Sequence, residues 1–364
     1  MLERVIISGG GTGGHIYPAL AIADEIKRRY PSCKILFVGA IGRMEMEKVP
    51  QSGYEIEGLD IAGLERKLFS KKNLGFIPRV IRSLRKSKKI IRSFQPQVAI
   101  GVGGYASGPL LYAAAGMGIP TVIQEQNSYP GITNKILAKK VNRICTGFDS
   151  MKKWFPEEKT VHTGNPLRAS ISGIKPTDEA YHAFGLNPSK KTLFVMGGSL
   201  GAASLNSAVQ TGAALLASND IQVLWQTGTR FFEKQKAFVI DQKHEHLHPV
   251  GFIGNMQQAY AVADVIVSRA GAMSIAELAL VAKPTILVPS PHVAEDHQTH
   301  NASAMTSSGA ALLLKDAEVV SKLAEQAVEL MNDSQRRVQM SNYMQVFARP
   351  DAASAVVNEI EKLV

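Results

Sequence analysis

The sequence has 364 residues, of which 45% are hydrophobic and 20% charged, so a disordered chain is excluded and about two domains are expected. No apolar run approaches the ~20 residues of a membrane-spanning helix, and the first residues enter a strand pattern without a secretory signal. The only cysteines, Cys33 and Cys145, are far apart, which excludes a disulfide framework or cysteine-based zinc site and favours a cytoplasmic setting.

The net charge of +10 arises in one stretch. Residues 66–92 hold eleven basic residues and no acidic one, and the rest of the chain has 30 basic against 31 acidic residues. The spacing of Ile77, Ile81, Leu84 and Ile91 predicts a helix with one apolar face. Such a helix is typical of anionic membrane surfaces; an apolar face buried in the core and RNA binding are the alternatives. The cations expected to form the membrane patch are Arg79, Arg82, Arg85, Lys86 and Lys89.

Strands and helices alternate along the first half of the chain. Short β-branched runs predict buried strands, and apolar residues spaced three and four apart predict helices. The expected strands are 4–8, 34–39, 98–102 and 121–123, and the expected helices are 16–29 and 109–117. Strand–helix–strand order predicts a parallel sheet with right-handed crossovers.

The same alternation starts again after a polar stretch at 170–178. Here the expected strands are 192–196, 223–225, 264–268 and 285–289, and the expected helices are 202–216, 274–280 and a final one at 351–363. The fold class is therefore α/β, with two Rossmann-like doubly wound domains. We expect them to span 1–165 and 166–349, and periodicity does not show on which of them the last helix, 350–364, packs.

A glycine turn, Gly9-x-Gly11-x-x-Gly14, stands between the first strand and the first helix. Glycines let the backbone approach a phosphate, and the helix N-terminus offers free N–H groups. A dinucleotide site would need an acid near the end of the second strand, and residues 39–43 contain none. A purely structural turn is the other alternative.

Two further helices in the second half begin after glycines, at 197–202 and at Gly271. Ser199 adds a hydroxyl donor, and Glu277 is a candidate for accepting both hydroxyls of a ribose, unless it is only a favourable charge near the helix N-terminus. Three such helix starts predict a bound nucleoside diphosphate at the carboxyl ends of the strands. The chain has no Asp-x-Asp pair to hold a metal on it. We therefore expect no metal and no cofactor, the alternative metal site being the loop with His292, His297 and His300.

Two residues are candidates for a general base. His15 follows the first glycine turn, where the helix N-terminus favours the neutral, proton-accepting imidazole; a structural histidine bound to a carbonyl is the alternative. Glu125 lies just past a strand end with Asn127. Turn formation is the competing explanation for both of these loop residues.

Six motifs in order resemble those of the bacterial peptidoglycan glycosyltransferase family, over essentially the whole chain. They are GGTGGH at 10–15, GGYASGP at 103–109, EQN at 125–127, GNP at 164–166, GGS with GA at 197–202, and RAGA at 269–272. The chain departs from the family pattern at Gln124, where the family has His, and at Leu200, where a polar residue is usual.

The resemblance implies two Rossmann-like domains of the GT-B type facing a cleft, and inverting transfer of N-acetylglucosamine from UDP-N-acetylglucosamine to undecaprenyl-pyrophosphoryl-N-acetylmuramyl-pentapeptide. The donor would bind mainly to the second domain and the lipid acceptor to the first, and the last helix, 350–364, would pack back on the first domain. The enzyme would be peripheral on the cytoplasmic face of the membrane, without a nucleic-acid partner. The implied donor contacts are Thr12, Gly13, Gly14, Asn127, Arg168, Ser199, Ile253, Ala272, Met273, Ser274, Ile275, Ala276, Glu277 and Gln298.

Three rivals remain on sequence alone. They are a transferase or epimerase of the same fold with another sugar nucleotide, a dinucleotide-dependent oxidoreductase, and a basic membrane- or RNA-binding protein without catalysis.

Overall fold

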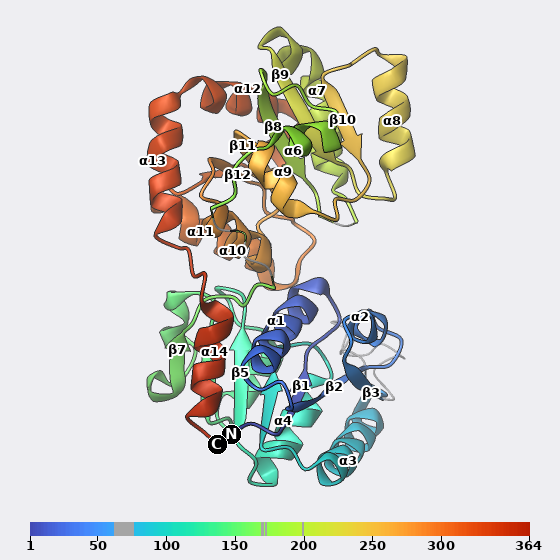
Figure 1. Cartoon of the computed structure of the whole chain (residues 1–364), viewed down its shortest axis with the longest axis vertical. Helices are drawn as coiled ribbons and strands as arrows, with labels where there is room; N and C mark the ends of the chain where they lie inside the picture. Colours follow the sequence, from blue (N-terminus) through green and yellow to red (C-terminus); the bar gives the residue numbers. More distant parts are fainter. Residues whose placement is uncertain (62–75, 169–170, 172, 199) are drawn as a thin grey trace. The chain divides into compact units, whose positions relative to one another are not determined.

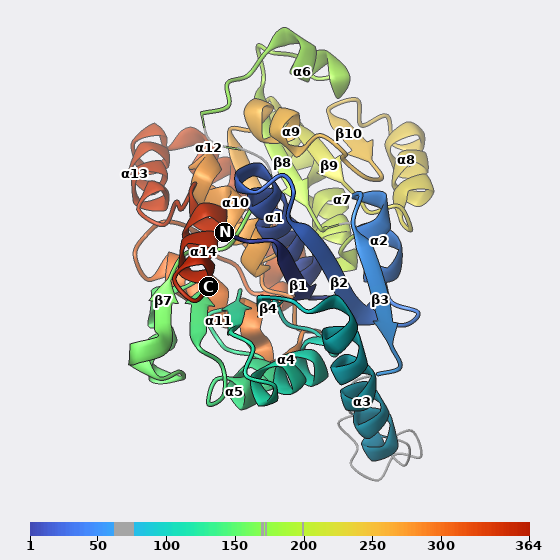
Figure 2. The same cartoon turned by 60° about the horizontal axis from the view of Figure 1, so that its bottom comes forward.

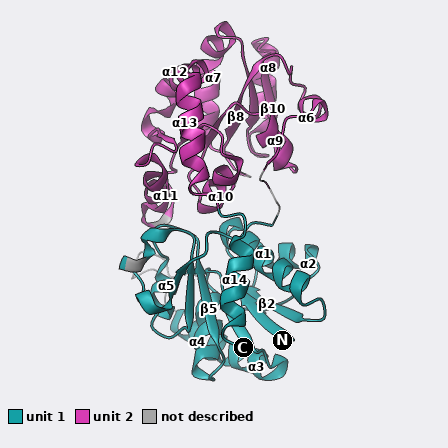
Figure 3. Cartoon of the chain, turned by 60° about the vertical axis from the view of Figure 1, so that its left-hand side comes forward, with its two compact units in different colours: residues 1–170, 349–364 teal, residues 171–348 magenta. Residues whose placement is uncertain are grey.

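The computed structural model describes residues 1–61, 76–168, 171, 173–198 and 200–364 (Figure 1). Ser199 and the first part of the basic stretch therefore lie outside the described residues. The chain forms two compact units, Met1–Ser170 with Arg349–Val364, and Ile171–Ala348 (Figure 3). The expected boundary after residue 165 falls a few residues before the observed one.

The first unit contains a seven-stranded sheet in which every neighbouring pair is parallel. The chain winds outward from β1 in one direction and then, from β4, in the other, so β1 and β4 flank the point where the strand order reverses. In sheet order the strands are β3 (Glu55–Leu59), β2 (Lys34–Ala40), β1 (Arg4–Ser8), β4 (Val98–Gly101), β5 (Thr121–Glu125), β6 (Arg143–Thr146) and β7 (Thr160–His162).

Helices cover both sides of this sheet, α1 and α14 on one side and α4 and α5 on the other (Figure 2). The core beneath α1 and α14 includes Val5, Ile7, Leu20, Val356 and Ile360, all at most 1% exposed. The helices of the unit are α1 (Gly13–Arg29), α2 (Glu45–Gln51), α3 (Phe76–Phe94), α4 (Ser107–Gly116), α5 (Ile132–Leu137) and α14 (Ala352–Glu361), with short 3-10 turns η2 (Asp149–Lys153) and η3 (Glu157–Lys159).

The second unit repeats the plan with a six-stranded parallel sheet. In sheet order its strands are β10 (Leu247–Val250), β9 (Ile221–Gln226), β8 (Lys191–Met196), β11 (Val265–Ser268), β12 (Thr285–Leu287) and β13 (Leu312–Leu313). The order reverses between β8 and β11, so their carboxyl ends are the expected ligand position.

Two helices of the second unit, α7 and α12, cross closely: a Cβ added to Gly212 would lie 2.4 Å from the Cβ of Ala324. Their facing side chains join a core that includes Trp225, which is fully buried. The helices are α6 (Asp178–Ala183), α7 (Ala203–Ser218), α8 (Phe232–Asp241), α9 (Met256–Val262), α10 (Ala272–Val281), α11 (His297–Thr306), α12 (Val319–Asn332) and α13 (Ser334–Gln345), with 3-10 turns η4 (Ala294–Asp296) and η5 (Asp316–Glu318).

The expected elements are present, and most of their ends differ from the expected ones by one to three residues. Helix α10 begins at Ala272 instead of Ser274, and α14 ends at Glu361 instead of Leu363. Helix α3 buries Ser83, Ser87, Ile90 and Ile91, whereas Ile77 is 69% and Ile81 44% exposed, so the alternative of an apolar face buried in the core does not hold for Ile77 and Ile81. Ile77 and Ile81 lie in the first two turns of α3, ahead of Ser83, where the buried positions of the helix begin among the described residues.

Among the described residues, no helix is both long enough and apolar enough to cross a bilayer.

Candidate functional site

The first glycine turn lies where the strand order of the first sheet reverses. It leaves the end of β1, and Thr12 precedes α1 with extended backbone and no side-chain cap. The loop after β4 lies directly against it, since a Cβ on Gly104 would be 2.4 Å from the carbonyl oxygen of Gly10. Gly11 and Gly104 both have positive φ angles, +87° and +88°, which only glycine adopts readily. Thr12, Gly13 and Gly14 thus stand at an open helix N-terminus, as a phosphate or sugar ligand requires.

His15 is half-buried in this turn. Its Nδ1 lies 3.1 Å from the carbonyl oxygen of Gly10 and 3.3 Å from Oγ1 of Thr12. Because a carbonyl only accepts, Nδ1 carries the hydrogen and Nε2 has the lone pair of the neutral ring. The structural interpretation and the base interpretation are therefore compatible: the carbonyl contact fixes the tautomer that a base at Nε2 needs.

Glu125 ends β5 and is only 2% exposed. Its Oε1 accepts from the backbone N–H of Asn127 at 3.1 Å, and its Oε2 accepts from the N–H of Gly131 and from Nδ2 of Asn134, at 3.0 and 2.9 Å. These bonds hold the loop between β5 and α5, including Asn127, at the same sheet edge as the glycine turn. They match the competing interpretation of Glu125 as a loop-forming residue.

Gln124, the departure from the family pattern, belongs to a buried amide network. Its Nε2 donates to Oδ1 of Asn165 at 2.9 Å, and Nδ2 of Asn165 donates to the carbonyl of Gln126 at 3.0 Å. The network ties the start of the segment leading into the second unit to the end of β5. This pairing was not predictable from local sequence, because 41 positions separate Gln124 and Asn165.

Arg168, an expected contact of the diphosphate, binds instead to the first unit's own α1. Its Nε lies 2.8 Å from Oδ2 of Asp24, and its Nη1 lies 3.3 Å from Oγ of Ser52. Both partners of the ion pair are about two-fifths exposed. A role at the diphosphate would require this exposed pair to open, and stays a prediction.

In the second unit, two glycine-led helix starts stand at the ends of the central strands. Helix α7 begins after β8. Helix α10 begins after β11, with Gly271 as its N-cap residue. Gly201 approaches the end of β9 so closely that a Cβ would lie 2.1 Å from the carbonyl oxygen of Thr227. Six of the expected contacts of the sugar-nucleotide donor lie in the first two turns of α10. They are Ala272, Met273, Ser274, Ile275, Ala276 and Glu277.

Glu277 has a partner that the sequence did not reveal. The hydroxyl of Tyr260 in α9, a fully buried side chain, donates to Oε2 of Glu277 at 2.7 Å. Burial raises the pKa of Glu277, and the Tyr260 hydrogen bond counteracts that rise. The tyrosine therefore orients one carboxylate oxygen and favours its charged, accepting form.

The remaining expected donor contacts lie in loops at the carboxyl edge of the second sheet. Ile253 follows β10 and is 4% exposed, so its backbone is the part suited to contact the nucleobase of the donor. Gln298 stands in the first turn of α11, and its Oε1 accepts from the backbone N–H of Ser290 at 2.9 Å. This bond orients the side-chain amide of Gln298 and turns its NH2 group away from Ser290.

Arg269 connects several of these loops. Its Nη1 donates to Oδ1 of Asp316 at 2.6 Å and to the carbonyl of Val288 at 3.1 Å, and its Nη2 donates to Oγ of Ser204 at 2.7 Å. The loops after β8, β11, β12 and β13 are thereby joined by one guanidinium. The family motif pointed to Arg269, but the sequence could not indicate these partners.

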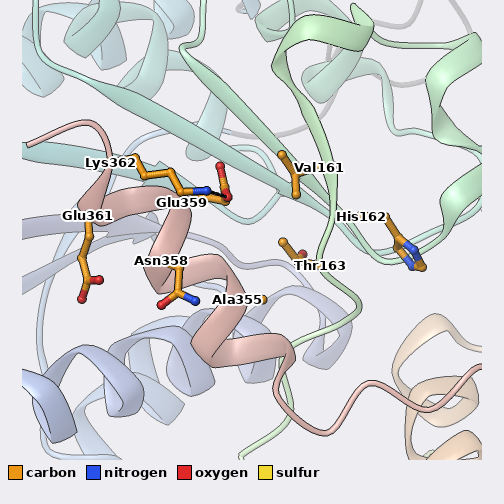
Figure 4. A pocket seen from close by; sticks show the side chains of 8 residues that line it. All are labelled: Val161, His162, Thr163, Ala355, Asn358, Glu359, Glu361 and Lys362. Carbon is orange, nitrogen blue, oxygen red and sulfur yellow. Dashed lines mark hydrogen bonds and ion pairs between the residues drawn. The ribbon is translucent and has the colours of Figure 1, made fainter.

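Within the described part of the chain, no three His, Cys, Asp or Glu side chains lie close enough to hold a metal ion, and His292, His297 and His300 form no such group. A pocket of about 480 Å3 lies between β7 and α14 and contains none of the expected site residues (Figure 4). It is lined by Val161, His162, Thr163, Ala355, Asn358, Glu359, Glu361 and Lys362.

Known proteins resemble the chain over its whole length. The glycosyltransferase family 28 N-terminal domain matches residues 5–146, and the C-terminal domain of that family matches residues 192–356. A UDP-N-acetylglucosamine--N-acetylmuramyl-(pentapeptide) pyrophosphoryl-undecaprenol N-acetylglucosamine transferase of Cytophaga hutchinsonii is 53% identical over 99% of this chain and 97% of its own.

Solved structures also resemble the chain over nearly its whole length. The crystal structure of MurG from Acinetobacter baumannii matches with a TM-score of 0.79 at 26% identity, covering 99% of both chains. A UDP-N-acetylglucosamine 2-epimerase shares the fold alone, with a TM-score of 0.65 at 12% identity over 99% of this chain and 95% of that one.

The two Rossmann-like units, with glycine-led helix starts at both switch points, define a glycosyltransferase of the GT-B fold. The chain belongs to glycosyltransferase family 28, and within it to the UDP-N-acetylglucosamine--N-acetylmuramyl-(pentapeptide) pyrophosphoryl-undecaprenol N-acetylglucosamine transferases.

Proposed function

We propose that the chain transfers N-acetylglucosamine from UDP-N-acetylglucosamine to the muramyl sugar of undecaprenyl-pyrophosphoryl-N-acetylmuramyl-pentapeptide, with inversion at the anomeric carbon. It is a hexosyltransferase of peptidoglycan synthesis. The observation that carries the proposal is the 53% identity to the Cytophaga hutchinsonii transferase over nearly the whole of both chains. His15, which lies where the strand order of the first sheet reverses, is oriented so that its Nε2 can act as the base.

In the reaction, the acceptor's sugar hydroxyl forms a bond from its oxygen to the anomeric carbon of N-acetylglucosamine. The bond from that carbon to the β-phosphate oxygen breaks, and its electron pair leaves with UDP. Nε2 of His15 takes the hydroxyl proton, because Nδ1 already donates to Gly10. The N-termini of α7 and α10 supply N–H groups for the charge that develops on the diphosphate.

Glu125 has a different role in this proposal. Four N–H donors, from Asn127, Gly131 and Asn134, already occupy its carboxylate, so it orders the loop that carries Asn127, and His15 alone is the base. Asn127 then contacts the donor sugar. Glu277 accepts the ribose hydroxyls, and Gln298 donates to the sugar.

The test is UDP release from UDP-N-acetylglucosamine, with and without a short-chain analogue of the lipid-linked muramyl-pentapeptide. Release that requires both substrates, with a disaccharide product, is expected. Release without acceptor, or equal turnover of other UDP-sugars, would contradict the assignment. His15→Ala should lower kcat far more than it weakens UDP binding; unchanged kcat would exclude His15 as the base.

We also propose that the enzyme binds the cytoplasmic face of the membrane through α3. The supporting observation is that Ile77 and Ile81 are exposed beside exposed cations, among them Arg79, Arg85 and Lys89. A peripheral membrane helix typically inserts apolar side chains into the membrane–water interface and places cations against anionic head groups. Two of the basic residues have other contacts: Arg82 pairs with Asp60 at 3.3 Å, and Lys86 donates to the carbonyl of Gly58 at 2.6 Å.

Reversing the charges of Arg82, Arg85 and Lys89 should weaken binding to vesicles containing anionic lipid and leave UDP binding unchanged. Each cation near the surface contributes roughly 1 kcal/mol, so the triple variant should lose most of its vesicle binding. Unaltered binding would refute the membrane role of α3.

A further inference from the structure

A buried carboxylate lies beneath the first glycine turn. Glu45 is the first residue of α2 and is only 1% exposed. Its Oε2 accepts from the backbone N–H of Gly11 at 2.8 Å, and its Oε1 accepts from the N–H of Ala40 at 3.0 Å. Glycines make room for it, since a Cβ on Gly10 would lie 2.2 Å from the carboxyl carbon of Glu45.

The peptide group that Glu45 binds is the one that His15 binds. The N–H of Gly11 and the C=O of Gly10 belong to a single planar amide. Glu45 accepts from its N–H side, and Nδ1 of His15 donates to its C=O side at 3.1 Å. Oγ1 of Thr12 lies 3.3 Å from the same Nδ1. Carboxylate, peptide group and imidazole therefore form one hydrogen-bonded series.

Such a series has a definite electrostatic direction. A carboxylate at the N–H end of an amide polarises it and makes its carbonyl oxygen a stronger acceptor, because successive hydrogen bonds reinforce one another. A stronger acceptor at Nδ1 holds the ring in one tautomer and stabilises the imidazolium that forms when Nε2 takes a proton. Catalytic carboxylates that contact histidine directly act in the same way.

We propose that Glu45 is a positioning residue for the transfer reaction, acting on His15 through the Gly10–Gly11 peptide group. The proposal rests on the proposed function in one respect, the role of His15 as the base. It gives Gly10 a function as well, because a side chain there would displace the carboxylate.

The other charged groups around the ring are engaged elsewhere. The glycine turn, residues 9–14, and the loop 101–108 contain no charged residue. On α1, Asp24 pairs with Arg168 and Glu25 with Arg28 and Arg29. On α2, Glu47 pairs with Lys48, and Arg43, which precedes α2, lies over the ring of Tyr105 at 5.9 Å. Glu45 is thus the carboxylate in contact with this turn.

The first test is Glu45→Gln, in which an NH2 group must face one of the two backbone N–H groups. Loss of the partner of a metal-binding histidine typically costs about ten- to a hundredfold; by analogy, kcat should fall by a similar factor while the Kd for UDP changes less than about twofold. The acidic limb of the pH profile of kcat should move to lower pH, because the imidazolium loses its stabilising charge. Glu47→Gln is the matched control on the same helix, and should change neither.

A second measurement does not depend on activity. In the unliganded protein, 15N chemical shifts of the His15 ring should report the Nδ1–H tautomer, and Glu45→Gln should shift the population toward Nε2–H. Glu45→Asp keeps the charge but is one methylene shorter, so its losses should be intermediate. That variant also serves if Glu45→Gln does not fold, which its melting temperature would show.

The outcomes separate the two proposals. If Glu45→Gln lowers kcat equally in the wild type and in a His15→Gln background, or if it leaves the His15 ring shifts unchanged, Glu45 does not act through His15 and the inference is overturned. If instead His15→Gln keeps full turnover while the ring shifts still respond to Glu45, the link between the residues stands and the assignment of the base fails.

Discussion

Arg29 in α1 and Glu361 in α14 are 332 positions apart and form an ion pair, with 3.0 Å between Nη1 and Oε1. The same guanidinium donates to Oδ1 of Asn358 at 2.7 Å and to the carbonyl of Ser354 at 3.1 Å, while its Nε donates to Glu25 at 2.8 Å. One arginine thus holds most of the polar face of the last helix against α1, beside the apolar contacts of Val356 and Ile360.

Arg29→Ala should destabilise the first unit by about 1–2 kcal/mol, because it removes several part-buried hydrogen bonds and leaves Glu361 without its ion-pair partner. The measurement is urea-induced unfolding at pH 7. Arg28→Ala is the control: its side chain is 69% exposed and binds only the neighbouring Glu25 among the contacts described above, so its effect on stability should be clearly smaller than that of Arg29→Ala. Equal losses in both variants would contradict the anchoring role of Arg29.

Glu25 should make the stability of the first unit sensitive to acid. The Arg28 hydrogen bond, opposed by burial and aided by Arg29, lowers the pKa of Glu25 from 4.5 to about 2. A lowered pKa means that the ionised form stabilises the fold above pH 4.5, and that this contribution is lost as the pH falls toward 2. The free-energy difference between wild type and Glu25→Gln should therefore shrink from pH 7 to pH 3. A constant difference would show that the charge of Glu25 does not matter.

Gly212→Ala should weaken the second unit. The added Cβ would lie 2.4 Å from that of Ala324, and overpacking costs ~1–3 kcal/mol, which exceeds the gain of up to ~1 kcal/mol in helix propensity. Gly116→Ala, at the exposed end of α4 with no atom within 4 Å of the added carbon, is the control and should be neutral or stabilising. Thermal unfolding of both variants decides, and a stabilised Gly212→Ala would disprove the close helix crossing.

Tyr260→Phe should weaken UDP binding by about three- to tenfold, because Glu277 loses the donor that orients it; a hydrogen bond of this kind contributes about 1 kcal/mol. The tyrosine counteracts the burial that raises the pKa of Glu277, so without it the carboxylate should protonate at higher pH. As the pH is lowered, UDP affinity measured by calorimetry should then begin to fall at a higher pH than in the wild type. An unchanged affinity and pH profile would separate Glu277 from the ribose.

The alternation of strands, glycine turns and helices was predictable because each depends on nearby residues. Val5 to Ile7 form a buried β-branched run, and glycines and a helical repeat follow at once. The partners across the sheet were not predictable. Glu45 lies five residues beyond the end of β2 and has no sequence signal that places it under Gly10, and Tyr260 is 17 positions from Glu277.

Which positions of α3 are buried was not predictable for a similar reason. Periodicity identified a helix with apolar and basic sides, but which side is buried depends on what the helix contacts. Ser83 and Ser87 are buried because α3 meets the loop after β3, where Ser83 donates to the carbonyl of Asp60. Small polar residues fit that close approach, and Ile77 lies on a part of the helix beyond it.

The return of the chain to its first unit affects how the protein is made. Because residues 349–364 complete a core built by residues 1–170, the second unit is an insertion within the first. On the ribosome, the second unit can finish folding while the first still exposes the apolar face of α1 that Val356, Val357 and Ile360 will cover. The first unit is therefore begun before the second and completed after it, and a chain that lacks residues 352–364 would leave the first unit with an open core.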